Sequence, residues 1–196
     1  MPNQNAICNM INAYFQANSF STMKFQTGDW NSIAEQVRTN SDGGGDNITP
    51  AILDLYGEGK NMMFDDTLPF RAYHRMLSVN YSDDETEYGN PGTTMREISE
   101  MKLIFIGSRF KMGTRPENVI AALEMDFPKE FKPIDISPLG LNKCVIEMGD
   151  VIYDPYAIWN EEFTGNDFSL PTDIIAISLR YRLHILFEKC CFNFCQ

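Results

Sequence analysis

The stretch Ile175–Phe187, IAISLRYRLHILF, decides the fold of this chain. Its odd-numbered positions are all aliphatic or aromatic, whereas Arg180, Arg182 and His184 fall on even-numbered positions. This alternation predicts a β-strand with one face on a core and one face in water. At about 3.3 Å per residue the strand would be roughly 40 Å long. Antiparallel sheets carry such one-sided strands, so we expect a mostly antiparallel sheet with helices on its apolar face.

The composition predicts one globular domain over residues 1–196. Hydrophobic residues make up 43% of the chain, which is ample for a core. Sixteen Lys and Arg against 27 Asp and Glu give a net charge of −11, which argues against a general nucleic-acid binder and against docking on anionic lipid. The apolar runs are far shorter than the ~20 residues of a membrane span, and Met1–Phe15 lacks the basic residue of a secretion signal. We therefore expect that the protein does not associate with a membrane and that it assembles in a cytoplasm.

Two segments have the periodicity of amphipathic helices. In residues 3–18 the apolar side chains recur at helical spacing, and the other face is polar but uncharged, which suits either an ordinary surface or a protein neighbour. A second helix is expected from Pro116, because Thr114 and Glu117 have the spacing of a capping box. The apolar stripe of the first helix consists of Ile7, Met10, Ile11, Tyr14 and Phe15.

The remaining chain predicts further strands joined by long loops. Ile33 and Val37 suggest a short helix or an extended turn. Long insertions are expected at about 40–49, 82–94 and 154–172, where glycine, acidic and turn-forming residues gather. The predicted fold class is therefore α+β, with a single mostly antiparallel sheet, two amphipathic helices packed on one face and long loop insertions. The other predicted strands are Phe20–Phe25, Pro50–Tyr56, Phe70–Tyr81, Met101–Phe110 and Cys144–Tyr153, the last with a bend at Gly149.

Few residues of this sequence indicate catalytic or binding chemistry. His74 lies between Arg71 and Arg75, and we interpret it as a solvated or interface histidine on the outer face of its strand; His184 is interpreted in the same way. No serine-nucleophile, phosphate-loop or dinucleotide-binding motif is present in the sequence. We expect no catalytic residue, no cofactor and no metal, and a protein that is not an enzyme.

The cysteines leave one alternative open. Cys190, Cys191 and Cys195 lie close to His184, so a metal site or a disulfide is conceivable, although the spacing fits no common zinc pattern. Plain reduced thiols are the favoured interpretation. The alternative function is a small cytoplasmic enzyme or a metal or redox module that uses this cluster.

Aromatic and charged residues in the predicted loops, and the arginines of the last strand, are candidates for protein–protein contacts. Long loops in a compact domain often bind a partner. The candidate interface residues are Asp83, Asp84, Glu85, Tyr88, Trp159, Phe163, Arg180 and Arg182.

The order of the predicted elements resembles that of tail-terminator and neck ring proteins, the head–tail connectors of tailed bacteriophages. The resemblance covers an opening helix, a proline-led strand, a long strand pair, a second helix and a final alternating strand. The phrases Tyr14-Phe15, Phe25-Gln-Thr-Gly-Asp-Trp30 and Pro50-Ala-Ile-Leu resemble structural proteins of crAss-like phages. The insertions at 82–94 and 154–172 have no counterpart in the pattern.

The resemblance implies a tail-terminator-like structural protein of the virion. It implies a homo-oligomeric ring of six or twelve subunits between neighbouring neck and tail proteins, because head-to-tail contacts that close by rotation form rings. DNA would pass through the ring without sequence-specific binding, in keeping with the acidic net charge of the chain.

Overall fold

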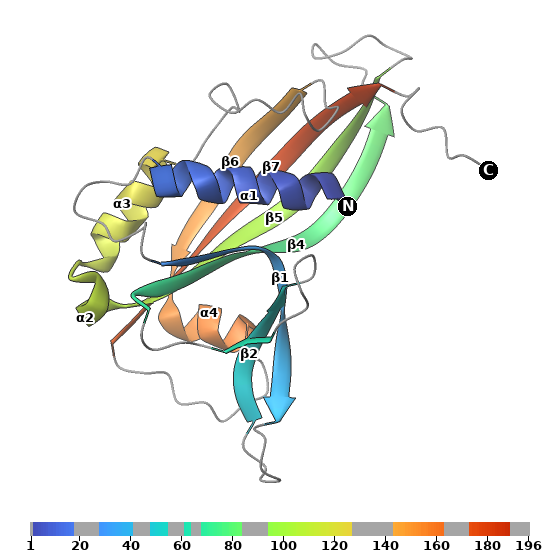
Figure 1. The fold of residues 1–196 in the computed structure, drawn as a ribbon. Helices are drawn as coiled ribbons and strands as arrows, with labels where there is room; N and C mark the ends of the chain where they lie inside the picture. Colours follow the sequence, from blue (N-terminus) through green and yellow to red (C-terminus); the bar gives the residue numbers. More distant parts are fainter. Residues whose placement is uncertain are drawn as a thin grey trace.

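One open mixed sheet organises the protein in a computed structural model, which describes residues 2–17, 28–40, 48–54, 61–63, 68–83, 94–126, 143–162 and 173–188 (Figure 1). The strand order in these residues is β3-β2-β1-β4-β5-β7-β6. The pairing of β1 with β4 is parallel and the other pairs are antiparallel, which confirms a mostly antiparallel sheet. The strands are β1 (Asp29–Asn40), β2 (Ile48–Asp54), β3 (Asn61–Met63), β4 (Phe70–Asp83), β5 (Thr94–Ser108), β6 (Lys143–Tyr153) and β7 (Ile174–Glu188).

The alternating stretch of the sequence forms β7, between β5 and β6. Its odd-numbered side chains from Ile175 to Ile185 are buried, as the period-two pattern predicts. The even-numbered face is not wholly in water, because Ala176 and Ser178 are buried as well. The exposed part of that face begins at Arg180.

Two helices cover the face of the sheet on which the odd-numbered side chains of β7 lie. Helix α1 (Pro2–Ala17) crosses the long strands, and α3 (Pro116–Asp126) lies beside β6 (Figure 1). Ile7, Ile11 and Phe15 of α1 are fully buried in the main core, together with Val119 and Leu123 of α3. The helical stripe thus points at the sheet as its i, i+4 and i+8 spacing requires.

An aromatic chain joins α1 to the strands. The ring of Trp30 stacks on Phe15 at a centroid distance of 5.2 Å and meets Phe70 edge-on at 5.4 Å. Phe70 in turn stacks on Phe105 at 4.5 Å. Such pairs contribute about 0.5–1.5 kcal/mol beyond their burial, so this chain fixes the corner where β1, β4 and β5 meet α1.

Helix α4 (Pro155–Glu162) was not predicted from the sequence. The segment 154–172 was expected to be loop, yet Asp154 caps a helix, since its Oδ1 accepts from the amide of Ala157 at 2.9 Å. Ile158 packs with Tyr73, Ile104 and Ala176 on the face opposite α1. The two predicted helices, α1 and α3, lie on one face as expected, and α4 is an additional helix that covers part of the second face.

Two further differences concern local structure. Ile33 lies in β1, so the helix or turn expected at 33–37 is a strand. The spacing of four residues between Ile33 and Val37 fits both a helical turn and alternate positions of a strand. A short helix, α2 (Arg109–Met112), follows β5 and ends at Gly113, whose φ of +64° is left-handed. The strand expected at Phe20–Phe25 and most of the insertions at 40–49, 82–94 and 154–172 lie outside the described residues.

Candidate interaction surface

The predicted interface residues fall into three groups. Arg180 and Arg182 are exposed side chains of β7. Asp83 is the last residue of β4 and Trp159 lies in α4, but the structure does not describe their side chains. Asp84, Glu85, Tyr88 and Phe163 lie outside the described residues.

The two arginines belong to a larger set of charged side chains on the sheet face opposite α1. We call this set the charged face. It lies next to α4, and most of its side chains come from β4, β5, β7 and β6. The register of these strands brings side chains of neighbouring strands together. The charged face consists of Arg75, Arg96, Glu100, Lys102, Lys143, Glu147, Asp150, Glu161, Arg180, Arg182 and His184.

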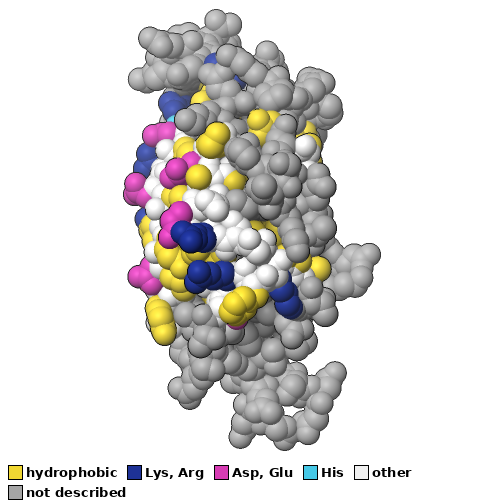
Figure 2. Space-filling model, turned by 90° about the vertical axis from the view of Figure 1, so that its left-hand side faces the viewer, with side chains coloured by type: hydrophobic (Ala, Val, Ile, Leu, Met, Phe, Trp, Pro, Cys, Tyr) yellow, Lys and Arg dark blue, Asp and Glu magenta, His cyan; other side chains and the backbone are white. Residues whose placement is uncertain are grey.

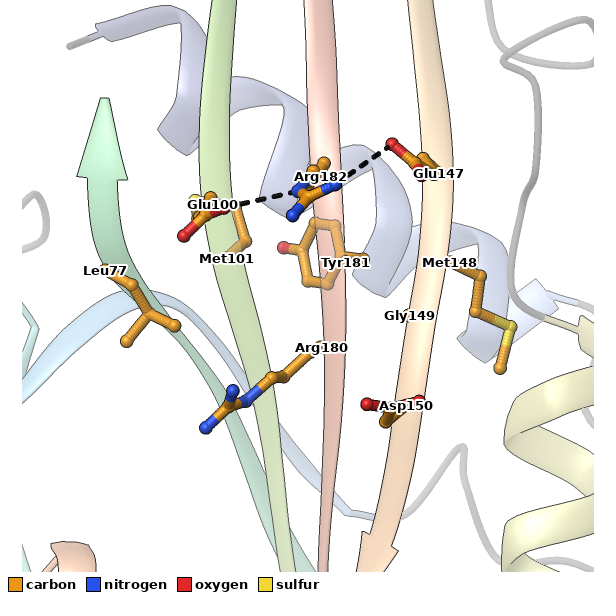
Figure 3. Close-up of a pocket in the computed structure, with 10 residues that line it drawn as sticks. All are labelled: Leu77, Glu100, Met101, Glu147, Met148, Gly149, Asp150, Arg180, Tyr181 and Arg182. Atoms are coloured by element: carbon orange, nitrogen blue, oxygen red, sulfur yellow. Dashed lines mark hydrogen bonds and ion pairs between the residues drawn. The ribbon is translucent and has the colours of Figure 1, made fainter. Parts of the chain in front are cut away.

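Ion pairs across the strands order the middle of the charged face. Arg182 lies between two carboxylates, with its Nε 3.2 Å from Glu100 Oε1 and its Nη1 3.7 Å from Glu147 Oε2 (Figure 3). His184 Nε2 lies 3.0 Å from the same oxygen of Glu147, and Arg96 Nε donates to His184 Nδ1 at 3.2 Å. The hydrogen bond from His184, then the positive charge of Arg182, lowers the pKa of Glu147.

A row of three basic residues crosses the sheet below these pairs. Arg75 of β4 is opposite Lys102 of β5, which is opposite Arg180 of β7. Lys102 is only 1% exposed, and its Nζ lies 2.7 Å from Glu161 Oε2 at the end of α4. The hydrogen bond from Lys102, with the charges of Lys102, Arg75 and Arg180, lowers the pKa of Glu161. The basic row thus already holds one carboxylate.

A groove of about 230 Å³ lies over β7 on the charged face. Its walls include Glu100, Glu147, Asp150 and Arg180, and Arg182 lies between Glu100 and Glu147 (Figure 3). The register of β6 against β7 shifts between Met148 and Val151, at the glycine where the sequence predicted a bend. Asp150 follows this bulge on the β6 side of the groove, whereas the side chain of Arg180 extends across β5 toward β4 (Figure 3).

Acidic and basic side chains alternate along this part of the surface. Apart from His184, the charged face consists of six basic and four acidic residues. It therefore has an excess of two positive charges in a chain of net charge −11. In the space-filling view, dark blue and magenta side chains follow one another along the left margin (Figure 2). Such a surface can hold the carboxylates of a partner by charge-assisted hydrogen bonds.

The buried side of the sheet holds a separate polar network that sequence reasoning missed. His74 was expected on an outer face, but it is fully buried under α1, because its parity places it with Phe70 and Ala72. Its Nε2 lies 2.8 Å from Asn12 Oδ1, and Asn12 donates to the carbonyl of Asn31 at 2.9 Å. The polar positions Gln4, Cys8 and Asn12, at helical spacing in α1, were the available signal.

The chemistry of this network is that of a core. Burial lowers the pKa of His74 to about 3 and raises the pKa of Cys8 to about 12, so both groups are uncharged at neutral pH. Cys8 Sγ lies 3.6 Å from the hydroxyl of Tyr181, which closes the network. Buried and hydrogen-bonded, the side chains of His74, Asn12, Cys8 and Tyr181 position α1 on the sheet.

The structure describes two of the five cysteines. Cys8 and Cys144 are buried free thiols, and Cys190, Cys191 and Cys195 lie outside the described residues. Among the residues whose placement is described, no three His, Cys, Asp or Glu side chains are grouped so as to hold a metal ion. Within the same residues, no helix is long and apolar enough to cross a membrane.

No protein-family model matches it, and no curated protein is significantly similar to it in sequence.

Proposed function

We propose that this protein is a structural subunit of a tailed-phage virion, which assembles into a closed ring at the head–tail junction. The ring joins the portal side to the tail and leaves a passage for DNA. The order of the elements suggests this role, and the charged face is the observation that supports it most.

A subunit of such a ring needs two different surfaces that recognise each other on adjacent copies. The charged face offers one of them. Arg182 and Glu147 keep 53% and 55% of their side chains exposed although they pair with each other. Exposed ion pairs of this kind contribute only about 0–1 kcal/mol to folding, so their regular arrangement over three strands serves recognition better than stability.

The net charge agrees with the passage of DNA. A ring of subunits that each carry −11 does not hold the phosphate backbone, because tight binding requires Lys and Arg to neutralise the phosphates. DNA can then slide through without being retained.

The proposal is tested by measuring the mass of the purified full chain. Native mass spectrometry is expected to give an assembly of six or twelve subunits, and electron microscopy of the same sample is expected to show rings with a central opening. A single-copy mass at every concentration up to about 100 µM, well above typical weak affinities, would contradict the ring.

A further inference from the structure

Strand β6 is the outermost strand on one side of the sheet, and β7 is its only strand neighbour among the described residues (Figure 1). Successive residues of an edge strand direct their N–H and C=O groups alternately toward the neighbouring strand and away from it. In the described part of the chain, no strand pairs with the groups that point away from β7. An edge of this kind is a template for another strand unless a bulge, a proline or an inward-pointing charge prevents the pairing.

Only the first half of β6 has the regular geometry that such pairing requires. Its register against β7 is unbroken from Lys143 to Met148 and shifts before Val151. A bulge twists an edge away from a partner strand, so it protects the second half of β6. Helix α3 also lies beside the part of the strand that carries Asp150, not beside Glu147 (Figure 3). The first half contains no proline and no bulge.

The charges of this first half are complementary to those of a second copy. Lys143 and Glu147 are exposed, carry opposite charges and lie on the same face of the sheet, with Val145 between them. When two copies of the strand run antiparallel with Val145 opposite Val145, Lys143 of each copy is opposite Glu147 of the other. Cross-strand pairs of opposite charge are favourable, and this register forms two of them.

We infer that β6 pairs antiparallel with β6 of a second copy of this chain, with the Val145 residues of the two copies opposite each other. The contact has two-fold symmetry, because each copy contributes the same strand. It joins two copies and does not by itself close a ring. The inference therefore goes beyond the proposed function and does not depend on it.

The pairing extends a row of alternating charges that the sheet already contains. Glu100 of β5 is opposite Arg182 of β7, which is opposite Glu147 of β6. The Arg182 side chain lies 3.2 Å from Glu100 and 3.7 Å from Glu147. Lys143 of the second copy is the next side chain in this row. Glu147 keeps 55% of its side chain exposed, so its carboxylate can accept from this ammonium group as well as from its own neighbours.

A second copy fits this edge better than an unrelated strand does. A charged edge strand disfavours partners that place a like charge or an apolar side chain opposite its charges. The spacing of four residues between Lys143 and Glu147 makes the strand complementary to itself when its direction is reversed. The two-fold axis then passes beside Val145, which is uncharged, so neither charge meets its own copy.

The first test exchanges charges in the full chain. Lys143→Glu and Glu147→Lys each place like charges opposite one another in a pair of identical copies. Each variant is therefore expected to pair at least about tenfold more weakly than the wild-type chain. A mixture of the two variants restores both attractive contacts. With one variant isotopically labelled, native mass spectrometry of the mixture is expected to show a pair that contains one copy of each.

Matched controls carry the same charge changes elsewhere on the surface. Lys111 of α2 and Glu124 of α3 are exposed and lie on elements other than β6. Lys111→Glu and Glu124→Lys are expected to pair as the wild-type chain does. Urea unfolding of all four variants checks that each is folded.

The second test uses the unchanged chain. Amide hydrogen exchange is measured at about 1 µM and at about 100 µM protein. Pairing is expected to slow exchange in the segment from Lys143 to Met148 as the concentration rises, whereas the segment from Gly149 to Tyr153 keeps one rate. Lys143→Glu is expected to remove this concentration dependence.

The outcomes separate this inference from the proposed function. If the mixture of charge variants pairs and exchange in the first half of β6 slows with concentration, the inference holds, whether or not rings form. If rings of six or twelve copies form but neither result is seen, the inference is wrong and the ring proposal stands. A pair of copies that survives Lys143→Glu unchanged contradicts the inference alone, because another surface then joins them. A chain that stays monomeric at about 100 µM contradicts both.

Discussion

The Nδ1 atom of His74 lies 2.7 Å from the hydroxyl of Tyr181, and both side chains are buried between α1 and the sheet. This hydrogen bond joins β4 to β7, two strands separated in the sheet by β5. It is the centre of the polar network that positions α1 on the sheet.

The stability of the protein should fall in acid because of His74. Its folded-state pKa is lowered to about 3, below the ordinary value of 6.5, so between these limits the unfolded chain binds a proton that the folded chain does not. The stabilising contribution is present above pH 6.5 and is lost as the pH falls toward 3. At pH 5 the loss attributable to this residue is about 2 kcal/mol, from ~1.4 kcal/mol per pH unit.

Urea unfolding from pH 7 to pH 4 measures this effect. His74→Gln is expected to be less stable at pH 7, but its free energy of unfolding should fall less steeply below pH 6.5. Equal slopes for the two proteins would show that His74 does not carry the acid sensitivity.

Removing the Tyr181 hydroxyl should destabilise the fold. Tyr181→Phe leaves His74 and Cys8 without their shared partner in a fully buried site, which costs about 1–3 kcal/mol. Tyr156→Phe is the matched control, because Tyr156 is 71% exposed and its hydroxyl is in water. Thermal unfolding of the two variants should differ clearly, and equal melting temperatures would argue against the network.

The ion pair between Lys102 and Glu161 should stabilise α4 on the sheet. Glu161→Gln removes the carboxylate 2.7 Å from a buried ammonium group, and we expect a loss of about 1–3 kcal/mol. The value lies below that of a fully buried pair because Glu161 is half-exposed. Glu124→Gln, an exposed change in α3, should have little effect on unfolding. Adding Lys102→Met to Glu161→Gln should recover stability, and failure to do so would contradict this electrostatic cause.

A side chain at position 28 should disrupt the aromatic corner. A Cβ atom on Gly28 would meet the ring of Phe70 at 2.0 Å, far inside contact distance. Gly28→Ala is therefore expected to cost about 1–3 kcal/mol through displacement of Phe70. The double variant Gly28→Ala/Phe70→Leu should lose less than the sum of the two single changes. Strict additivity in denaturant unfolding would rule out the clash.

The sheet is predictable from the sequence wherever one face is buried. β7 and the hairpin of β4 and β5 show period-two patterns or continuous apolar runs, so their pairing follows from parity. β1 was not predicted, because the spacing of Ile33 and Val37 fits the period of a helix and the period of a strand. α4 was not predicted, because it buries few side chains. Among those described, Ile158 is the one that is buried. Asp154 and Pro155 are nevertheless ordinary residues for the start of a helix.

The candidate site was predictable only in part. The exposure of Arg180 and Arg182 follows from their even positions in β7. The sequence could not place Glu100, Glu147 and Asp150 around them, because these come from other strands and depend on register and on the bulge in β6. His74 was misplaced because α1 supplies a buried polar partner, Asn12, that strand parity alone does not reveal.

The number of copies of this chain in an intact virion tests the central claim most directly. Quantitative mass spectrometry of purified phage particles that encode the chain should find six or twelve copies per particle, as a single closed ring requires. Hundreds of copies would instead indicate a capsid or tail-tube component. Absence of the chain from the particles would contradict a structural role in the virion altogether.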